Sequence, residues 1–350
     1  MNTVHVNASR SYEVLIGKGL LDTIGSYAAA TKKVKQVCIV SECNVWPLYG
    51  ERVKESLLAA GLSAVEFVFG AGEEQKNAET YLKLLNFLAE KQLTRTDLIV
   101  ALGGGVVGDL SGFAAATYLR GIPFIQVPTT LLAAVDSSVG GKTAIDLPAG
   151  KNLVGAFYQP SLVLCDTDCL HSLPLEIFRD GCAEVIKYGV LYDPALFAHL
   201  AEKGLDFDRE WVITRCVELK RDVVAEDEFD TGARMKLNLG HTVGHGVEAQ
   251  SHFRVSHGRA VAIGMAIVSR AGEKRGICEA AAKDAILEIL SKFGLPCSCA
   301  YSAESLYASA LSDKKRSGGT VNLIVPERIG FCRIVPTPVE EVQSFIEAGL

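Results

Sequence analysis

Residues 97–120 read DLIVALGGGVVGDLSGFAAATYLR, and this stretch decides the fold class. An apolar run with strand character, DLIVAL, ends in three consecutive glycines, and a helical pattern follows over residues 108–118. A second strand pattern, PFIQVPTT, comes next at 123–130. A strand, a helix and a strand in this order are typical of a parallel sheet whose strands are connected by helices.

The same alternation extends outward from this stretch. Strand patterns lie at residues 34–40, 64–70, 97–105, 123–130 and 161–170, and helical patterns separate them at 46–60 and 77–91. After residue 170 helical patterns predominate, at 175–190, 194–203, 209–225, 239–250, 258–275, 279–292 and 302–311. We therefore predict an α/β fold in two domains. Residues 1–172 form a Rossmann-like parallel-sheet domain, and residues 173–350 form a mainly helical domain.

A late apolar stretch, TVNLIVPERIGFCRIV at residues 320–335, interrupts the helical half. It predicts two short strands, which we expect to pack back onto the first domain. Ligands favour the carboxyl ends of parallel strands. We therefore expect the chemistry at those strand ends and on the first helices of the second half.

Charge and hydropathy exclude several classes of protein. The chain has 35 basic and 41 acidic residues, a net charge of −6, so it lacks the long-range positive field that draws proteins to nucleic acid or anionic membranes. No run of about 18 apolar residues occurs, and the first residues contain no apolar signal segment. The ten cysteines include no CxxC pair, which favours reduced, buried thiols. We expect a soluble, cytoplasmic protein without nucleic-acid or membrane partners.

The glycine run Gly103–Gly108 matches the pattern GxGxxG between a strand and a helix. Such a loop lets backbone N–H groups approach a pyrophosphate at a helix N-terminus. A tight turn without a ligand fits the same pattern, and the acidic residue expected about 20 positions later is absent. Glu42, Asn44 and the Gly70–Lys76 loop offer acids and amides for a ribose, or are ordinary polar loops.

Four of the seven histidines lie within 17 residues, and two of them, His241 and His245, share one helix face with Glu248. Thr242 follows the first histidine, so the general base of an HExxH zinc protease is missing. The pair is either a packed pair or part of a metal site, for which His257 offers a third nitrogen.

Glu184, in the apolar segment GCAEVIKYG, is the best carboxylate ligand for such a site. An unpaired acid in an apolar helix would cost several kcal/mol. The alternative is a surface ion pair with Lys187, which lies at i+3. Several basic residues lie beside glycines and turns. Each is a single solvated charge unless the side chains converge on one site, and their spacing in the sequence cannot show whether they do. They are Arg120, Lys142, Lys151, Arg234, Lys314 and Lys315, with Lys220 in a helix.

Several long motifs together resemble the 3-dehydroquinate synthase family of sugar-phosphate cyclases, which acts in the shikimate pathway toward chorismate and the aromatic amino acids. The motifs are GGGVVGDLSGFAAATYLRG (103–121), QVPTTLLAAVDSSVGGKTAID (126–146), GKNLVGAFYQP (150–160), DGCAEVIKYG (180–189), LNLGHTVGHGVE (237–248) and SHGRAVAIGM (256–265). The resemblance covers about half of the chain and is specific because the motifs occur together.

The resemblance implies an NAD-dependent lyase with one divalent metal, Zn²⁺ or Co²⁺. It would convert 3-deoxy-D-arabino-heptulosonate 7-phosphate to 3-dehydroquinate and phosphate. Transient oxidation of carbon 5 would acidify the proton on carbon 6 so that phosphate can leave. Reduction and an intramolecular aldol closure would follow. A homodimer is expected, with Arg120 reaching a phosphate across the subunit boundary.

The resemblance also implies the site residues, with NAD bound by residues 1–172 and metal and substrate bound by residues 173–350. The metal ligands would be Glu184, His241 and His257. Catalytic residues would be His245 as proton shuttle, Lys187, Lys220 and Asp136. Substrate-binding residues would be Arg120, Lys142, Asn152, Arg234, Asn238 and Lys314. With the residues considered above, the NAD-binding set is Glu42, Asn44, Ala71, Gly72, Glu73, Glu74, Gln75, Lys76, Gly104, Gly105, Val106, Val107, Gly108, Asp109, Thr129, Thr130, Lys142, Lys151, Cys169, Leu170, His171 and Ser172.

Three alternatives compete with this hypothesis. A metal-dependent NAD polyol dehydrogenase would need neither a phosphate nor a carboxylate clamp. Other cyclases act on sedoheptulose 7-phosphate or glucose 6-phosphate, and these substrates have no carboxylate. Arg234 and Asn238 therefore favour the acid substrate. A catalytically inactive binding protein would have no reason to keep the acid, the histidines and Lys187 together.

Overall fold

The glycine-ended strand predicted at residues 97–105 is β5 (Leu98–Gly103), a fully buried interior strand of a seven-stranded sheet. The strand order is β1-β2-β9-β6-β5-β3-β4. All neighbours pair in parallel except β1 and β2, which form an antiparallel edge. The other strands of this sheet are β1 (Asn2–Val6), β2 (Tyr12–Gly17), β3 (Gln36–Glu42), β4 (Ser63–Phe69), β6 (Phe124–Pro128) and β9 (Leu162–Asp166). The predicted fold class is confirmed, but the sequence patterns missed β1 and β2.

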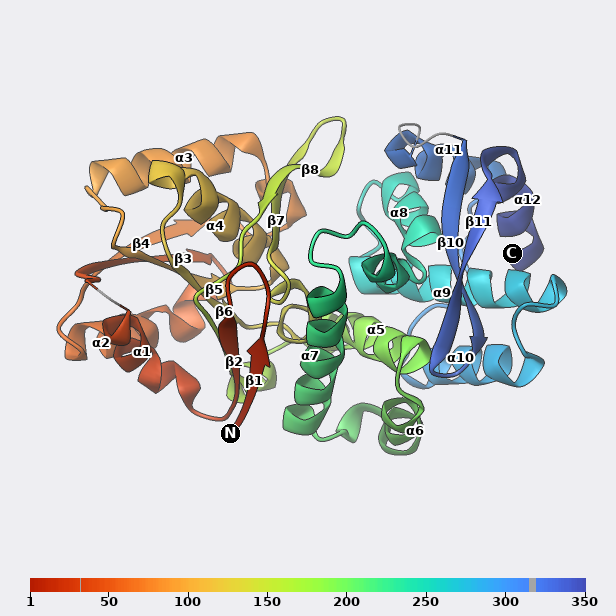
Figure 1. The fold of residues 1–350 in the computed structure, drawn as a ribbon, viewed down its shortest axis with the longest axis horizontal. Coiled ribbons are helices and arrows are strands. Elements are labelled where there is room, and N and C mark those ends of the chain that lie inside the picture. Colours follow the sequence, from red (N-terminus) through yellow and green to blue (C-terminus); the bar gives the residue numbers. More distant parts are fainter. Residues whose placement is uncertain (32, 315–318) are drawn as a thin grey trace. The chain divides into compact units, whose positions relative to one another are not determined.

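Helices cover both faces of this sheet (Figure 1). Val37 and Ile39 of β3 face a core that α1 and α2 complete, and Cys38 and Val40 face a second core with α3 and α4. The helices are α1 (Ile24–Ala30), α2 (Glu51–Ala59), α3 (Ala78–Glu90) and α4 (Gly105–Thr117). Because both faces of the sheet are covered there, the interior strands β3, β5 and β9 are continuous apolar runs rather than alternating ones.

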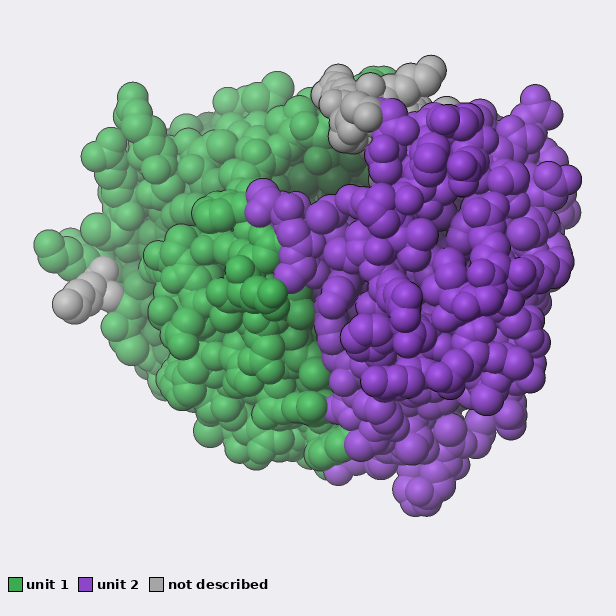
Figure 2. Space-filling model, turned by 45° about the vertical axis from the view of Figure 1, so that its right-hand side comes forward, with its two compact units in different colours: residues 1–173, 209–229 green, residues 174–208, 230–350 purple. Residues whose placement is uncertain are grey.

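The structure is a computed structural model that describes residues 1–31, 33–314 and 319–350, and it divides into two units (Figure 2). Unit 1 is Met1–Leu173 with Arg209–Phe229, and unit 2 is Pro174–Asp208 with Asp230–Leu350. The sequence-based division at residues 172 and 173 differs by one residue at this boundary. It also differs in assigning α7 (Arg209–Glu226) to the helical half.

Contacts with the sheet domain explain why α7 belongs to unit 1. The Lys220 Nζ atom donates to both the carbonyl and the Oδ1 of Asp136, each at 2.7 Å. Just beyond α7, the Glu228 carboxylate accepts from the Ser9 backbone at 2.7 Å and from the Gln159 amide at 2.8 Å. These partners lie far away in the sequence, so a local pattern could not reveal them. Unit 1 also contains an unpredicted hairpin, β7 (Lys142–Leu147) and β8 (Gly150–Phe157).

Unit 2 is built around α9 (His257–Lys274), most of whose residues are buried. Its other helices are α5 (Leu175–Leu191), α6 (Pro194–Lys203), α8 (His241–Gln250), α10 (Ala280–Lys292), α11 (Ala303–Lys314) and α12 (Val339–Gly349). The two late strands are β10 (Thr320–Arg328) and β11 (Phe331–Pro338), an antiparallel pair.

The predicted packing of the late strands onto the first domain was wrong. β10 and β11 belong to unit 2, where β10 packs on α9 and α10. Buried Val321, Leu323 and Val325 of β10 supply an apolar face that these helices cover. Among the residues that the structure describes, no helix is long and apolar enough to cross a membrane. All ten cysteines are free thiols.

Candidate metal centre and cofactor-binding edge

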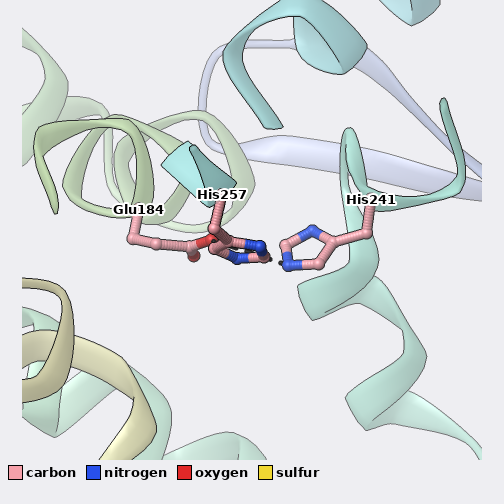
Figure 3. Close-up of side chains that lie close together, drawn as sticks. All are labelled: Glu184, His241 and His257. Carbon is pink, nitrogen blue, oxygen red and sulfur yellow. Dashed lines mark ion pairs between the residues drawn. The ribbon is translucent and has the colours of Figure 1, made fainter. Parts of the chain in front are cut away.

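The three predicted metal ligands meet at one point of unit 2. Glu184 comes from α5, while His241 and His257 are the first residues of α8 and α9. Glu184 Oε1 lies 3.5 Å from His241 Nε2 and 3.3 Å from His257 Nε2, and the three ligand atoms lie within 4.8 Å of one another. Figure 3 shows the side chains pointing toward one another from their separate helices.

Glycines bring these helices together. A Cβ atom on Gly264 of α9 would lie 1.9 Å from the carbonyl oxygen of Gly240, the residue before His241. A Cβ on Gly258 would lie 1.9 Å from the Asp180 carbonyl oxygen on α5. Since real Cβ contacts are never this short, backbones approach here as only glycine allows. The glycines of the GHTVGHG and SHGRAVAIG segments therefore set the spacing of the ligands.

Asp180 also fixes the start of α9. Its Oδ1 accepts a hydrogen bond from the Arg259 backbone N–H at 2.9 Å and another from the Ser256 hydroxyl. An acceptor at these first N–H groups acts as an N-cap, supplied here by a different helix. This contact holds the backbone of His257 against α5, one turn before Glu184.

Glu184 and Lys187 form a buried pair. Their side chains are 0% and 1% exposed, and the ammonium contacts the carboxylate. The alternative of a surface ion pair is therefore wrong. Charges this deeply buried require compensation, and a bound cation would add to the compensation that Lys187 gives the carboxylate.

The two ligand histidines have opposite protonation tendencies. Burial and the nearby Lys187 lower the pKa of His241 to about 3, so its ring is neutral. Burial also disfavours the charged form of His257, but the Glu184 and Glu248 carboxylates outweigh it and raise its pKa to about 10. Because a metal binds an imidazole through an unprotonated nitrogen, a cation at this centre would compete with protonation of His257.

The donor set fits a borderline divalent cation. Two imidazoles and one carboxylate are the ligands of many catalytic zinc sites, in which further positions stay open for substrate or water. His245 lies on the exposed side of α8, one turn after His241, and its ring centre is 5.5 Å from that of His241 and 6.5 Å from that of His257. It stands beside the three ligands but is not one of the cluster.

Apart from Lys142 and Lys151 of the β7–β8 hairpin, the candidate NAD-binding residues of unit 1 lie at or just after the carboxyl ends of five parallel strands, β3, β4, β5, β6 and β9. In that order they are Glu42 and Asn44, Ala71–Lys76, Gly104–Asp109, Thr129 and Thr130, and Cys169–Ser172. Carboxyl ends of parallel strands share one edge of the sheet, so five separate segments converge there. The connections run in opposite directions from β3 and β5, which makes this edge a switch point where ligands bind.

Lys76 lies at the centre of a charged cluster beside the glycine loop. Its side chain is 4% exposed, and its ammonium lies 2.7 Å from Asn152 Oδ1, 3.1 Å from Glu73 Oε1 and 3.2 Å from Asp109 Oδ2. Burial raises the pKa of Asp109 to about 6 against the opposing effect of Lys76. Lys151 joins through Glu73 at 3.3 Å. Asn152, expected at the substrate, thus lies with residues expected at the cofactor.

The remaining predicted residues occupy varied places. Asp136 and Lys220 pair in unit 1, where Lys142 is exposed and Arg120 is exposed with a left-handed backbone (φ 68°). In unit 2 Arg234 is 2% exposed and Asn238 is half-buried. Lys314 ends α11, but its side chain, like all of Lys315, lies outside the described residues.

Two residues next to the metal centre received no role from the sequence. Glu248 was noted only for its spacing from His241, and Asp180 stood unremarked within a motif. Spacing gave a signal for Glu248 alone, because Asp180 caps a helix that begins 77 residues later.

Comparison with known proteins identifies the family. Models described as 3-dehydroquinate synthase N-terminal and C-terminal match residues 66–180 and 181–316. The chain belongs to the 3-dehydroquinate synthase family. A 3-dehydroquinate synthase from Enterococcus faecalis is 44% identical over 350 residues and covers 98% of both chains.

Solved structures of related cyclases share the family's fold. One is a 2-deoxy-scyllo-inosose synthase complexed with carbaglucose-6-phosphate, NAD⁺ and Co²⁺, with a TM-score of 0.90, 25% identity and full coverage of both chains. Another is a 2-epi-5-epi-valiolone synthase from Streptomyces hygroscopicus with NAD⁺ and Zn²⁺ bound. Its TM-score is 0.88 at 27% identity, covering 99% of this chain and 97% of that one.

Proposed function

We propose that the chain is a 3-dehydroquinate synthase. It converts 3-deoxy-D-arabino-heptulosonate 7-phosphate to 3-dehydroquinate and phosphate, using NAD and one Zn²⁺ or Co²⁺. The observation that carries the proposal is the Glu184–His241–His257 centre, in a chain 44% identical over its length to a synthase of that name.

The residues of the structure fit both the divalent cation and NAD. The three ligand atoms suit the cation, and α4 begins at Gly105 in a glycine loop suited to a pyrophosphate. When bound, NAD would take a hydride from carbon 5 of the substrate and later return it, while the metal would polarise the oxygen on that carbon. NAD⁺ with Co²⁺ or Zn²⁺ in the two related cyclases supports this assignment.

His245 is proposed to carry the protons of the reaction. It is exposed, sits beside the ligands on α8 and is separate from the ligand cluster. An imidazole there can accept the proton from the carbon-5 hydroxyl and give it back when the ketone is reduced. The ketone makes the carbon-6 proton acidic, which allows the phosphate on carbon 7 to leave.

Basic and amide side chains are proposed to hold the substrate's phosphate and carboxylate. Arg234 is almost fully buried, where a guanidinium can form two parallel hydrogen bonds with a carboxylate. Asn238 lies on the same short helix. Lys187 and the Asp136–Lys220 pair are proposed to contact the part of the substrate that undergoes the reaction. The anion-binding set is completed by Arg120, Lys142, Asn152 and Lys314.

The assembly and location are also proposals. We propose a homodimer in which the exposed Arg120 reaches a phosphate in the partner's site. We also propose that it works in the cytoplasm, where its ten free thiols would stay reduced.

Phosphate release from the heptulosonate phosphate, with NADH followed in the same cuvette, tests the proposal. A synthase releases phosphate without net NADH, because each hydride is returned. Net NADH in proportion to turnover would show a polyol dehydrogenase. No phosphate release in the presence of NAD and either metal would refute the proposal.

A further inference from the structure

The two ligand histidines have different partners on the ring side that faces away from Glu184. His241 Nδ1 lies 3.1 Å from the carbonyl oxygen of Leu239, a neutral acceptor. His257 Nδ1 lies 3.5 Å from Glu248 Oε1, a carboxylate oxygen. A ring that binds a metal through Nε2 carries its proton on Nδ1 and needs an acceptor there. Both rings have one, but only that of His257 is anionic.

Glu248 is held firmly at the end of α8. Its side chain is 3% exposed, and it lies two turns after His241 on the same helix. Its own carbonyl accepts hydrogen bonds from the Phe253 backbone N–H and the Ser251 hydroxyl, both at 2.9 Å, which close the helix end. A buried carboxylate costs several kcal/mol unless its charge is compensated. The Oε1 atom of this carboxylate lies 3.5 Å from His257 Nδ1, which places the charge where it can act on that ring.

We propose that Glu248 is a positioning residue of the metal centre, a role that rests on the proposed function. Its carboxylate keeps the proton of His257 on Nδ1 and fixes the plane of the ring. The Nε2 lone pair then points to the same place as those of Glu184 and His241. The negative charge of Glu248 also makes the His257 imidazole a stronger electron-pair donor to the metal than the imidazole of His241, whose Nδ1 partner is a neutral carbonyl.

Cobalt titration of the metal-free, full-length protein tests this role. Visible absorption of bound Co²⁺ reports both affinity and ligand geometry. The wild type is expected to bind one Co²⁺. Glu248→Gln keeps the shape of the side chain but removes its charge, and is expected to bind Co²⁺ about 10–100-fold more weakly with a changed spectrum. A residue with a merely structural role would not change the spectrum at saturating Co²⁺.

Asp193→Asn is the matched control. Asp193 is another buried carboxylate of unit 2, and it caps α6 through the Ala195 and Leu196 N–H groups at 2.9 and 3.0 Å. Asn caps helices as well as Asp does, so this variant should keep wild-type affinity and spectrum. Wild-type affinity and spectrum in Glu248→Gln would overturn the role of Glu248 alone. Absence of Co²⁺ binding by the wild type would overturn the metal centre, and Glu248's role with it.

A measurement on the wild type covers the case in which Glu248→Gln does not fold. In Zn²⁺-loaded protein with ¹⁵N-labelled histidine, His257 should be the Nδ1–H tautomer, with a ring proton that exchanges slowly. An Nε2–H tautomer at His257 would contradict the proposal, since its Nε2 could not then bind the metal.

Discussion

Gly264→Ala should damage the metal centre without touching any ligand. The new Cβ would lie 1.9 Å from the Gly240 carbonyl oxygen, whereas contacts under 3.0 Å essentially never occur. The backbones of α8 and α9 must therefore separate by about 1 Å, several times the tolerance of roughly 0.2 Å in a metal–ligand distance. Because Gly240 directly precedes His241, this movement displaces one ligand from the other two. We expect Zn²⁺ and Co²⁺ affinity to fall at least about 10–100-fold.

Overpacking will also destabilise the fold, by about 1–3 kcal/mol, so the variant needs a control with equal strain elsewhere. Gly349→Ala provides it. Its Cβ would lie 2.1 Å from the Ile267 carbonyl oxygen, also on α9, but its own helix is α12, which carries no ligand. Metal titration and thermal unfolding on both variants separate the effects. Gly349→Ala should unfold earlier yet keep its metal affinity. Equal metal loss in both variants, or wild-type affinity in Gly264→Ala, would refute the spacing argument.

Three further predictions concern the site residues themselves. Chelation should abolish turnover, and addition of Zn²⁺ or Co²⁺ should restore it. His257→Ala should lose both metal and turnover. Full metal stoichiometry in that variant, measured by elemental analysis, would show that the ligand set is wrong. His245→Ala should lower kcat by about 10²–10⁴-fold, the usual range for an acid–base group, with metal content unchanged on the same preparation; loss of metal would make it a ligand. Arg234→Lys should lose about 1.5–3 kcal/mol of substrate affinity without weakening NAD or metal binding, and the wild type should discriminate against sedoheptulose 7-phosphate, which has no carboxylate for Arg234; similar kcat/KM for both sugars would exclude the clamp.

The sequence predicted the parts of the fold whose patterns are local. The apolar runs of β3, β5 and β9 are continuous because both faces of the sheet are covered there, and each is followed by a polar or glycine-rich turn. Polar residues interrupt the first strands, so β1 and β2 were missed. The placement of α7 depends on the Lys220–Asp136 contact between residues 84 apart, which no local pattern contains.

The metal ligands were found partly by spacing and partly by family resemblance. Residue spacing pointed to His241 and to an acid in an apolar helix, but the meeting of α5, α8 and α9 depends on backbone contacts made at Gly240, Gly258 and Gly264. Sequence alone does not show which glycines make such contacts. The contact between Glu248 and His257 could be found only in the structure, because the Glu248 carboxylate meets His257 across a turn between two helices.

Substrate deuterated at carbon 5 tests the central claim most directly. The proposed synthase removes the hydrogen from that carbon and returns it to the same molecule within one turnover. Mass spectrometry should therefore find the deuterium retained in 3-dehydroquinate, with phosphate released in equal amount and no label in the NAD pool after many turnovers. Transfer of the label to the nicotinamide pool, or a product that has lost it, would contradict the proposed chemistry.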